Sequence, residues 1–269
     1  MDHLCAPVEE ACAGYVRPLF APLLDGNYDL PGGLGRLSVF TRSGKHRLKE
    51  QKPMLFVDAI WPAAYCISDY LVRNPSLVRG KNVIELGAGA ALPSCVAAKL
   101  GAECVLITDY PATDVIENIS DVIAANGIAN ASASSYVWGD DVAPLMDRLK
   151  ESDNKGFDLI LMADLFWKDT YHLHRNLLDA IKKLQAPLPI TSSSSLLSSS
   201  QSTPLCLIAF AHRPTELHTP SKDLEFFKVA SEEYNYHCQL IEVCDKYGDD
   251  TDNDSDSVEV FLYAIFAHS

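Results

Sequence analysis

The sequence is short of positive charge. Its 269 residues include 22 Lys and Arg against 36 Asp and Glu, which gives a formal net charge of −14. Proteins that bind nucleic acid usually present a surface rich in Lys and Arg to the phosphates. We therefore expect no direct binding to nucleic acid, whereas a basic protein or peptide would be attracted to this chain.

Long apolar runs and a leader sequence are also missing. No segment approaches the roughly 18 apolar residues that suggest a membrane-spanning helix, and residues 1–30 lack a basic stretch followed by an apolar one. The eight cysteines form no C-x-x-C pair, and most lie in apolar segments, where a free cysteine acts as a small hydrophobe. We expect a monomeric, cytoplasmic protein with reduced cysteines, no membrane association and no metal site.

Two segments differ in composition from the rest of the chain. Residues 190–204 are mostly serine, and Asp245–Ser257 contains six Asp in thirteen residues. Such segments bury too little apolar surface to order themselves, which predicts a Ser-rich surface insertion and a solvated acidic loop. The spacing of the aspartates does not fit a calcium-binding loop, because Ser257 stands where that loop needs Gly.

Apolar, β-branched runs alternate with amphipathic segments over most of the chain. The alternation predicts β-α-β units and a doubly wound, mostly parallel sheet. The expected strands are Asn82–Leu86, Cys104–Thr108, Ala133–Trp138, Phe157–Ala163, Leu205–Ala211, Tyr236–Val243 and Val258–Ala267. The expected helices are Pro62–Val72, Ala91–Leu100, Ala112–Ala125, Val142–Lys150, Asp169–Leu184 and Ser221–Glu233.

The last two strands break this rhythm. The acidic loop between them is too short to contain a helical crossover, so they should form an antiparallel hairpin. The expected fold class is α/β: a Rossmann-like, seven-stranded, mostly parallel sheet with a C-terminal antiparallel hairpin and helices on both faces. We expect this domain over residues 55–269 and an N-terminal arm over residues 1–54, in which Leu37–Phe40 is a candidate edge strand.

The most informative segment is a glycine-rich turn after the first strand of the sheet. Glu85-Leu-Gly-Ala-Gly89 ends a buried strand and precedes a helix, and Gly87 and Gly89 allow a sharp turn that a ligand can approach closely. Asp109 follows the next strand, where an acidic side chain can accept both ribose hydroxyls of a nucleoside. A dinucleotide site would have a third glycine at the position that Leu92 occupies, which disfavours a nicotinamide oxidoreductase.

The Glu-x-Gly-x-Gly pattern resembles the first motif of methyltransferases that use S-adenosyl-L-methionine. Trp61-Pro-Ala-Ala, Thr108-Asp-Tyr-Pro and Ala163-Asp-Leu-Phe-Trp are similar to motifs of the protein lysine methyltransferase group called family 16. His212-Arg-Pro and Lys222-Asp-Leu-Glu-Phe-Phe resemble its branch that methylates the N-terminal region of translation elongation factor 1-alpha, once labelled nicotinamide N-methyltransferase-like. The resemblance covers residues from about Leu55 to the C-terminus.

The resemblance implies an S-adenosylmethionine site and places it on particular residues. The implied cofactor-binding residues are Trp61, Glu85, Gly87, Ala88, Gly89, Asp109, Tyr110, Trp138 and Ala163. Asp109 would hold the ribose, Tyr110 and Trp138 would flank the adenine, and Ala163 would lie beside the sulfonium. Taken singly, Trp61 and Trp138 are better explained as core aromatics, but together with Asp109 they favour a site.

The predicted catalytic residues are Asp164 and Trp167. They follow the fourth strand and resemble the family's Asp/Glu-x-x-aromatic motif, with Trp in the place usually held by Tyr or Phe. Asp164 would accept hydrogen bonds from an incoming ammonium group and Trp167 would form the wall of its channel. Alternatively, Asp164 caps the helix that follows.

Four other polar residues have open or peripheral roles. His212 and Arg213 either bind substrate or pair with acidic neighbours, and His172 and His174 should face solvent.

The leading hypothesis is protein N-methylation, at the N-terminal amine or a nearby lysine of an elongation-factor-1-alpha-like protein. The alternatives are small-molecule N-methylation and a non-catalytic module that binds cofactor and partner.

Overall fold

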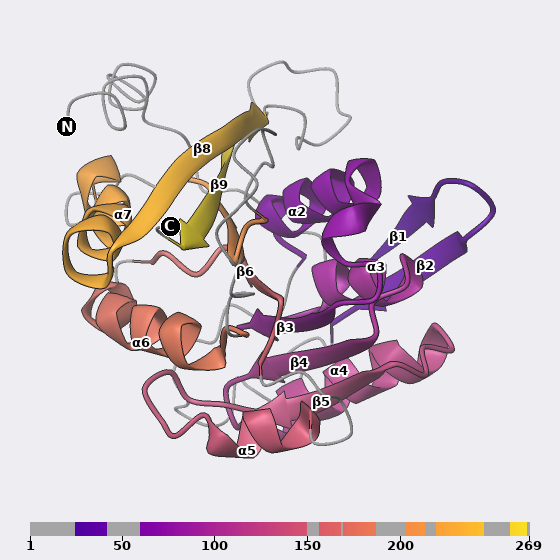
Figure 1. Cartoon of the computed structure of the whole chain (residues 1–269). Coiled ribbons are helices and arrows are strands. Elements are labelled where there is room, and N and C mark those ends of the chain that lie inside the picture. Colours follow the sequence, from indigo (N-terminus) through magenta and orange to yellow (C-terminus); the bar gives the residue numbers. More distant parts are fainter. Residues whose placement is uncertain are drawn as a thin grey trace, which may run out of the picture.

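The central feature of the fold is a seven-stranded sheet (Figure 1). The computed structural model describes residues 25–41, 60–149, 156–167, 169–186, 203–212, 219–244 and 259–267. The strands lie in the order β5-β4-β3-β6-β7-β9-β8. They are β3 (Asn82–Leu86), β4 (Cys104–Asp109), β5 (Ala131–Ser135), β6 (Leu159–Ala163), β7 (Cys206–Phe210), β8 (Tyr236–Cys244) and β9 (Val260–Ala267).

The direction of the strands confirms the predicted fold class. Strands β3 to β7 pair in parallel, whereas β9 is antiparallel to both β7 and β8. The parallel strands need crossover connections, and the antiparallel pair does not. The sheet is therefore Rossmann-like and ends in the antiparallel hairpin expected from the sequence.

Helices cover both faces of the sheet. Side chains of one hydrophobic cluster join α2 (Pro62–Arg73), α3 (Leu92–Lys99) and α4 (Thr113–Ala125) to one face. A second cluster joins α5 (Ala143–Met146), α6 (His174–Leu184) and α7 (Pro220–Tyr234) to the other. None of the helices in the described part of the chain is both long and apolar enough to cross a bilayer.

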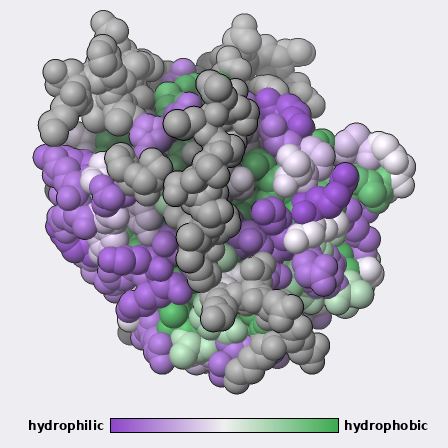
Figure 2. Space-filling view, in the orientation of Figure 1, coloured by the Kyte–Doolittle hydropathy of each residue, from purple (hydrophilic) through white to green (hydrophobic). Residues whose placement is uncertain are grey.

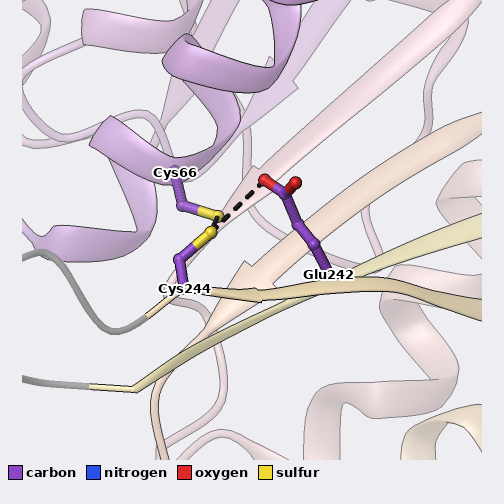
Figure 3. Close-up of side chains that lie close together, drawn as sticks. All are labelled: Cys66, Glu242 and Cys244. Atoms are coloured by element: carbon purple, nitrogen blue, oxygen red, sulfur yellow. Dashed lines mark hydrogen bonds between the residues drawn. The ribbon is translucent and has the colours of Figure 1, made fainter.

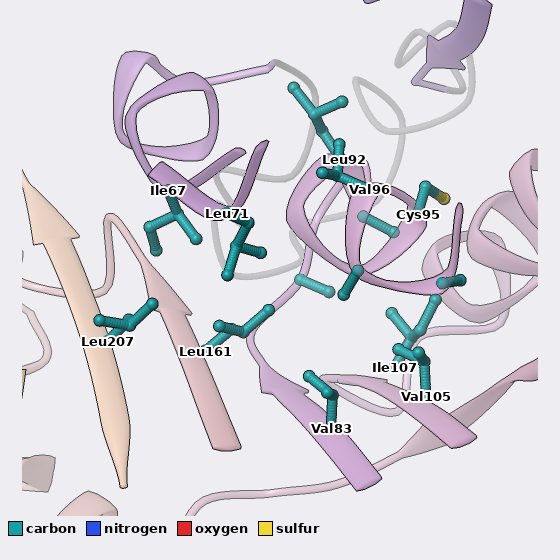
Figure 4. Packing of buried hydrophobic residues seen from close by; sticks show 14 of the residues in the cluster. Ile67, Leu71, Val83, Leu92, Cys95, Val96, Val105, Ile107, Leu161 and Leu207 are labelled. Carbon is teal, nitrogen blue, oxygen red and sulfur yellow. The ribbon is translucent and has the colours of Figure 1, made fainter. Parts of the chain in front are cut away.

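The core strands are apolar on both faces because each is buried between helices. Along β6, Leu159 and Leu161 belong to one cluster, and Ile160 and Met162 belong to the other. This alternation follows from the two-residue period of a strand. Figure 4 shows the first cluster, in which α3 packs over β3 and β4, and Ile67 of α2 lies toward β6 and β7.

Helix α6 shows how the outer layer divides between core and solvent. Leu177, Leu178 and Ile181 are buried, whereas Asp179 and Lys182 are exposed. The hydrophilic surface over α6 and α7 in Figure 2 has this origin. The predicted start of this helix at Asp169 was too early, because a 3₁₀ turn (Tyr171–Leu173) precedes α6.

The candidate edge strand within the N-terminal arm does not join the main sheet. It forms β2 (Gly35–Phe40), which pairs only with β1 (Asp25–Leu30) in a separate two-stranded antiparallel sheet. Asn126 at the end of α4 holds this hairpin, because its side-chain amide exchanges two hydrogen bonds of 2.8 Å with the backbone of Ser38. The prediction of an edge strand was wrong because the sheet edges belong to β5 and β8.

The remainder of the N-terminal arm, the acidic loop and most of the Ser-rich insertion lie outside the described residues.

Candidate active site

A cavity of about 290 Å³ opens at the carboxyl ends of β3, β4 and β6. Ligands of open α/β sheets bind in this crevice, because the loops that leave the strands converge there. Its walls come from the loops after these strands, from the segment after β5 and from the start of α2. Of the predicted site residues, the lining includes Trp61, Gly87, Ala88, Gly89, Asp109, Tyr110, Trp138, Ala163, Asp164 and Trp167.

The loop between β3 and α3 forms the floor of the cavity. Gly87 has a φ of +65°, in the region that side chains other than glycine rarely adopt. A Cβ atom at Gly87 would lie 2.6 Å from Cδ2 of Leu165 and 3.2 Å from Cζ2 of Trp138. The position therefore favours glycine for its backbone conformation, and a Cβ there would force the side chains of Leu165 and Trp138 to shift.

Asp109 connects this loop to the end of β4. Its Oδ2 accepts a hydrogen bond of 2.7 Å from the backbone N–H of Gly89, and its Oδ1 accepts one of 2.6 Å from Tyr110. The residue is only 6% exposed but still lines the cavity. A carboxylate fixed in this way presents oxygen acceptors to a ligand from a rigid support.

Glu85 is the one predicted site residue that does not line the cavity. It is completely buried in β3, and its Oε2 accepts hydrogen bonds from the backbone N–H and the hydroxyl of Ser94 in α3. Loss of solvation, opposed by the Ser94 bonds and assisted by the charge of Asp109, raises the pKa of this carboxyl group to about 8. In this structure Glu85 ties β3 to α3 from beneath the loop, and its direct contact with a cofactor stays a prediction.

Three aromatic side chains surround the upper part of the cavity. Tyr110 is 44% exposed at the mouth, whereas Trp61 and Trp138 are partly buried. The backbone carbonyl of Trp138 accepts a hydrogen bond of 2.9 Å from Nδ2 of Asn176 in α6. Trp138 was predicted to end a strand, but β5 ends three residues earlier at Ser135, and Trp138 lies in the loop beyond it.

Asp164 and Trp167 lie together on the loop that follows β6. Asp164 has a φ of +61°, which is rare for a residue with a side chain, and its backbone N–H donates to the carbonyl of Ala209 at 2.8 Å. The indole N–H of Trp167 donates to the carbonyl of Asp164 at 2.7 Å. The ring of Trp167 meets that of Trp61 edge to face, with centroids 5.1 Å apart. Asp164 is therefore held at the cavity next to an aromatic wall.

The structure shows the surroundings of His212, His172 and His174. Nδ1 of His212 lies 2.7 Å from Oδ2 of Asp223, with both side chains buried, so His212 pairs with an acidic neighbour. His172 is exposed as predicted, whereas the prediction for His174 was wrong. Its ring is buried against Phe166 and Phe226, because the 3₁₀ turn rotates the start of α6 toward the core. Arg213 lies outside the described residues.

Several lining residues were missed by the sequence analysis. Thr170 supports the loop after β6, because its hydroxyl donates to the carbonyl of Leu165 at 2.7 Å and accepts from the N–H of Trp167 at 2.8 Å. The hydroxyl three residues after Trp167 was the available signal, since Ser and Thr commonly bond to nearby backbone. Ile60, Asp169 and Leu173 carried no comparable signal.

The family of the chain follows from comparison with known sequences. A sequence model of the family described as lysine methyltransferase matches residues 44–232, or 189 of the 269 residues. The chain belongs to this family. Membership implies S-adenosylmethionine as the cofactor, and the cavity fits that molecule, with a floor at Gly87 that a Cβ would fill and a carboxylate at Asp109.

Individual relatives are fungal proteins named protein N-terminal and lysine N-methyltransferase EFM7. The relative from Schizosaccharomyces pombe is 33% identical over 181 residues, 66% of this chain and 64% of its own length. The relative from Eremothecium gossypii is 35% identical over 192 residues, which are 68% of this chain and 64% of its own length. The one from Debaryomyces hansenii is 31% identical over 225 residues, 80% of each chain. The chain thus covers less than two thirds of the first two relatives.

Solved structures show the fold. A protein classed as a methyltransferase, crystallised with S-adenosylhomocysteine, aligns with a TM-score of 0.53 at 16% identity, over 93% of this chain and 58% of its own. A protein from Pyrococcus horikoshii that is classed as an RNA methyltransferase aligns with a TM-score of 0.50 at 14% identity. The alignment covers 81% of this chain and 91% of that protein. Both likenesses concern the fold alone.

Proposed function

We propose that the protein transfers methyl groups from S-adenosylmethionine to amino groups at the N-terminal region of a protein, specifically elongation factor 1-alpha. The names of the fungal relatives support N-terminal and lysine amines as targets. The motif resemblance suggests the elongation factor. The observation that carries the proposal is the position of Asp164, whose backbone is held by the indole of Trp167 and by Ala209, at the same cavity as the glycine loop.

The chemistry requires an amine with a free lone pair. S-adenosylmethionine supplies an activated methyl group, so the protein must orient the amine and exclude water. An α-amino group has a pKa near 7.7–8.0 and a lysine near 10.4, so the terminal amine loses its proton more easily. Asp164 accepts hydrogen bonds from the incoming ammonium group, which releases one proton to solvent before its lone pair attacks the methyl group, and Trp167 and Trp61 border its path.

The remaining predicted residues hold the cofactor in this proposal. Asp109 accepts hydrogen bonds from the ribose hydroxyls, and the loop from Gly87 to Gly89 lies under the methionine and ribose. Tyr110 and Trp138 enclose the adenine. Ala163 leaves space beside the sulfonium, since its side chain is a single methyl group.

Charge and location complete the proposal. The net charge of −14 favours encounter with a basic partner surface through long-range attraction. Elongation factors act in the cytoplasm, so we place the protein there, as a monomer that binds neither membranes nor nucleic acid.

The test has two stages. Calorimetric titration with S-adenosylhomocysteine compares the wild type with Asp109→Ala, and we expect binding to weaken at least about tenfold in the variant, as loss of hydrogen bonds to a charged group implies. Methyl transfer is then measured on purified elongation factor 1-alpha, with Asp164→Asn as the catalytic variant. Asn keeps the shape and tolerates the left-handed backbone of Asp164, so a lower rate with unchanged cofactor affinity reports the charge.

Substrate variants locate the methylated atom. Blocking the N-terminus by acetylation removes one target, and replacing nearby lysines with arginine removes the other. Loss of labelling in either variant supports the proposal. Labelling of small molecules without any protein would favour a small-molecule enzyme, and cofactor binding without transfer to any acceptor would favour a binding module.

A further inference from the structure

Two buried thiols and a carboxylate meet on the side of the sheet that α2 covers. Sγ of Cys66 in α2 lies 3.5 Å from Sγ of Cys244, at the end of β8. Sγ of Cys244 lies 3.3 Å from Oε1 of Glu242. Figure 3 shows the three side chains converging, and their ligand atoms all lie within 4.8 Å of one another.

A bulge in β8 creates this arrangement. Tyr236 and Cys238 face the cluster beneath α6 and α7, and strict alternation would turn Glu242 and Cys244 to that same face. The register shifts between Leu240 and Glu242. Cys244 therefore belongs to the opposite cluster, with Cys66. β-Bulges commonly re-aim side chains at functional positions.

Two of the three separations between these atoms fit a tetrahedral zinc site. Zinc binds thiolate sulfur at about 2.3 Å and carboxylate oxygen at about 2.0–2.2 Å in tetrahedral sites, which places two sulfurs about 3.8 Å apart and sulfur and oxygen about 3.5 Å apart. The two sulfurs lie 3.5 Å apart, Sγ of Cys244 and Oε1 of Glu242 lie 3.3 Å apart, and Sγ of Cys66 lies within 4.8 Å of the carboxylate oxygen. We propose that Cys66, Glu242 and Cys244 form a zinc site, with water as the fourth ligand.

The surrounding charge is suited to such an ion. Two thiolates and a carboxylate around Zn²⁺ leave one net negative charge. The guanidinium of Arg73 donates to Oε1 of Glu242 at 2.5 Å and offsets that charge. Carboxylate ligands are usually oriented by a second hydrogen-bonding partner of this kind. Soft thiolate ligands also favour zinc over magnesium or calcium.

Cys238 shows how a cysteine without such a role is placed on the same strand. Its Sγ is buried on the opposite face and contacts the carbonyl of Phe227 at 3.9 Å. It packs as a small hydrophobe, as buried cysteines commonly do. It is therefore a matched control for Cys66 and Cys244.

The site joins α2 to the far edge of the sheet. Cys66 lies in α2, the helix whose N-terminal cap is Trp61 at the cofactor cavity. A metal ion there would link α2 to β8 through residues that do not line the cofactor cavity. No metal site was expected, since the cysteines form no C-x-x-C pair; Cys66 and Cys244 are 178 residues apart.

The experiment measures metal content directly. The full chain is produced with zinc in the medium, purified under a phosphine reductant without chelators, and analysed by mass spectrometry of the metal. We expect close to one zinc per chain in the wild type and in Cys238→Ala, and a loss of at least about tenfold in Cys66→Ala and Cys244→Ala, since each removes a thiolate ligand.

Cobalt tests the site in the unaltered protein, so the result does not depend on whether a variant folds. Replacing zinc with Co²⁺ in the wild type should give sulfur-to-cobalt charge-transfer bands and the intense visible bands of tetrahedral cobalt. A chelator should also lower the melting temperature of the wild type. A wild type without zinc or cobalt bands, zinc that persists in both cysteine variants, or a Cys66–Cys244 disulfide in place of the metal would each overturn the proposal.

Discussion

The indole N–H of Trp167 donates a hydrogen bond of 2.7 Å to the backbone carbonyl of Asp164. Asp164 holds a left-handed backbone conformation with a φ of +61°, which costs about 1–2 kcal/mol for a residue with a Cβ. Two hydrogen bonds offset that cost: the one from Trp167, and the one that the backbone N–H of Asp164 donates to the carbonyl of Ala209. Trp167 therefore positions Asp164 as well as bordering the cavity.

Trp167→Phe should separate these two roles. The substitution keeps an aromatic wall and removes the donor to Asp164, so we expect kcat/KM for the protein substrate to fall about fivefold, equivalent to a net hydrogen bond of ~1 kcal/mol. Affinity for S-adenosylhomocysteine should stay within about twofold, because the aromatic wall is kept. This measurement is the control for an intact cavity. An unchanged kcat/KM would show that the indole N–H does not position Asp164.

Gly87→Ala should be more harmful than the same change at Gly80. Both glycines have a φ of +65°, but a Cβ at Gly80 meets nothing within 4 Å, whereas one at Gly87 lies 2.6 Å from Cδ2 of Leu165. We expect Gly80→Ala to lower the melting temperature by roughly 2–4 °C, for ~1 kcal/mol of backbone strain, without changing cofactor affinity. Gly87→Ala should also weaken S-adenosylhomocysteine binding at least about tenfold. Equal binding by the two variants in calorimetry would contradict a close-packed floor at Gly87.

Glu85 should make stability depend on pH. Burial raises its pKa to about 8 in the folded protein, above the value of about 4.3 expected when unfolded. Between these values the folded protein keeps a proton that the unfolded chain releases, so the free energy of unfolding falls as pH rises and levels off above pH 8. From pH 6 to pH 8 the loss should reach roughly 2 kcal/mol.

The neutral variant Glu85→Gln tests this prediction. Its amide oxygen can still accept from Ser94, and it cannot ionise, so its melting temperature should fall less than that of the wild type between pH 6 and pH 9. Thermal unfolding of both proteins over this range is the measurement. Parallel pH profiles would assign the dependence to another group.

Asn176→Ala should act on the cofactor from outside the cavity. Its Nδ2 donates to the carbonyl of Trp138 at 2.9 Å, so its loss should loosen Trp138 and weaken S-adenosylhomocysteine binding about fivefold, for a net bond of ~1 kcal/mol. Asn130→Ala removes a comparable amide that donates to Ala102 at 2.7 Å, and Asn130 is not among the residues that line the cavity. Calorimetry compares the affinity of both variants for S-adenosylhomocysteine. An equal loss of affinity in the two variants would mean that general destabilisation is responsible.

Much of the cavity could be anticipated because local sequence encodes where strands end. Gly87 and Asp109 follow strands whose apolar character is unmistakable, and parallel strands bring such ends to one edge. Trp138 was harder to place, because the run Ala133–Trp138 is apolar enough to continue as a strand. β5 stops at Ser135 because its partner β4 stops at Asp109, and the last backbone bond joins Tyr136 to Asp109 at 2.8 Å.

Features that depend on contacts between distant segments could not be predicted from the local sequence. The burial of His174 depends on the packing of Phe166 and Phe226 around a 3₁₀ turn. The docking of β1 and β2 on α4 involves a pair of hydrogen bonds between Asn126 and Ser38 and one from Asn118 to the carbonyl of Phe40. Most of the partners of these side chains lie far away in the sequence, so local patterns do not reveal them.

The sequence by itself determined the layered α/β fold, the terminal hairpin and the residues that would gather at the strand ends. Those features follow from the period of apolar residues and from glycine positions, which act over a few neighbours. Only the tertiary structure decided that Glu85 lies beneath the cavity, that Trp167 holds Asp164 in place, and that a bulge in β8 brings Cys244 to Cys66. These depend on the register and crossing of whole elements, where a shift of one residue turns a side chain to the opposite face.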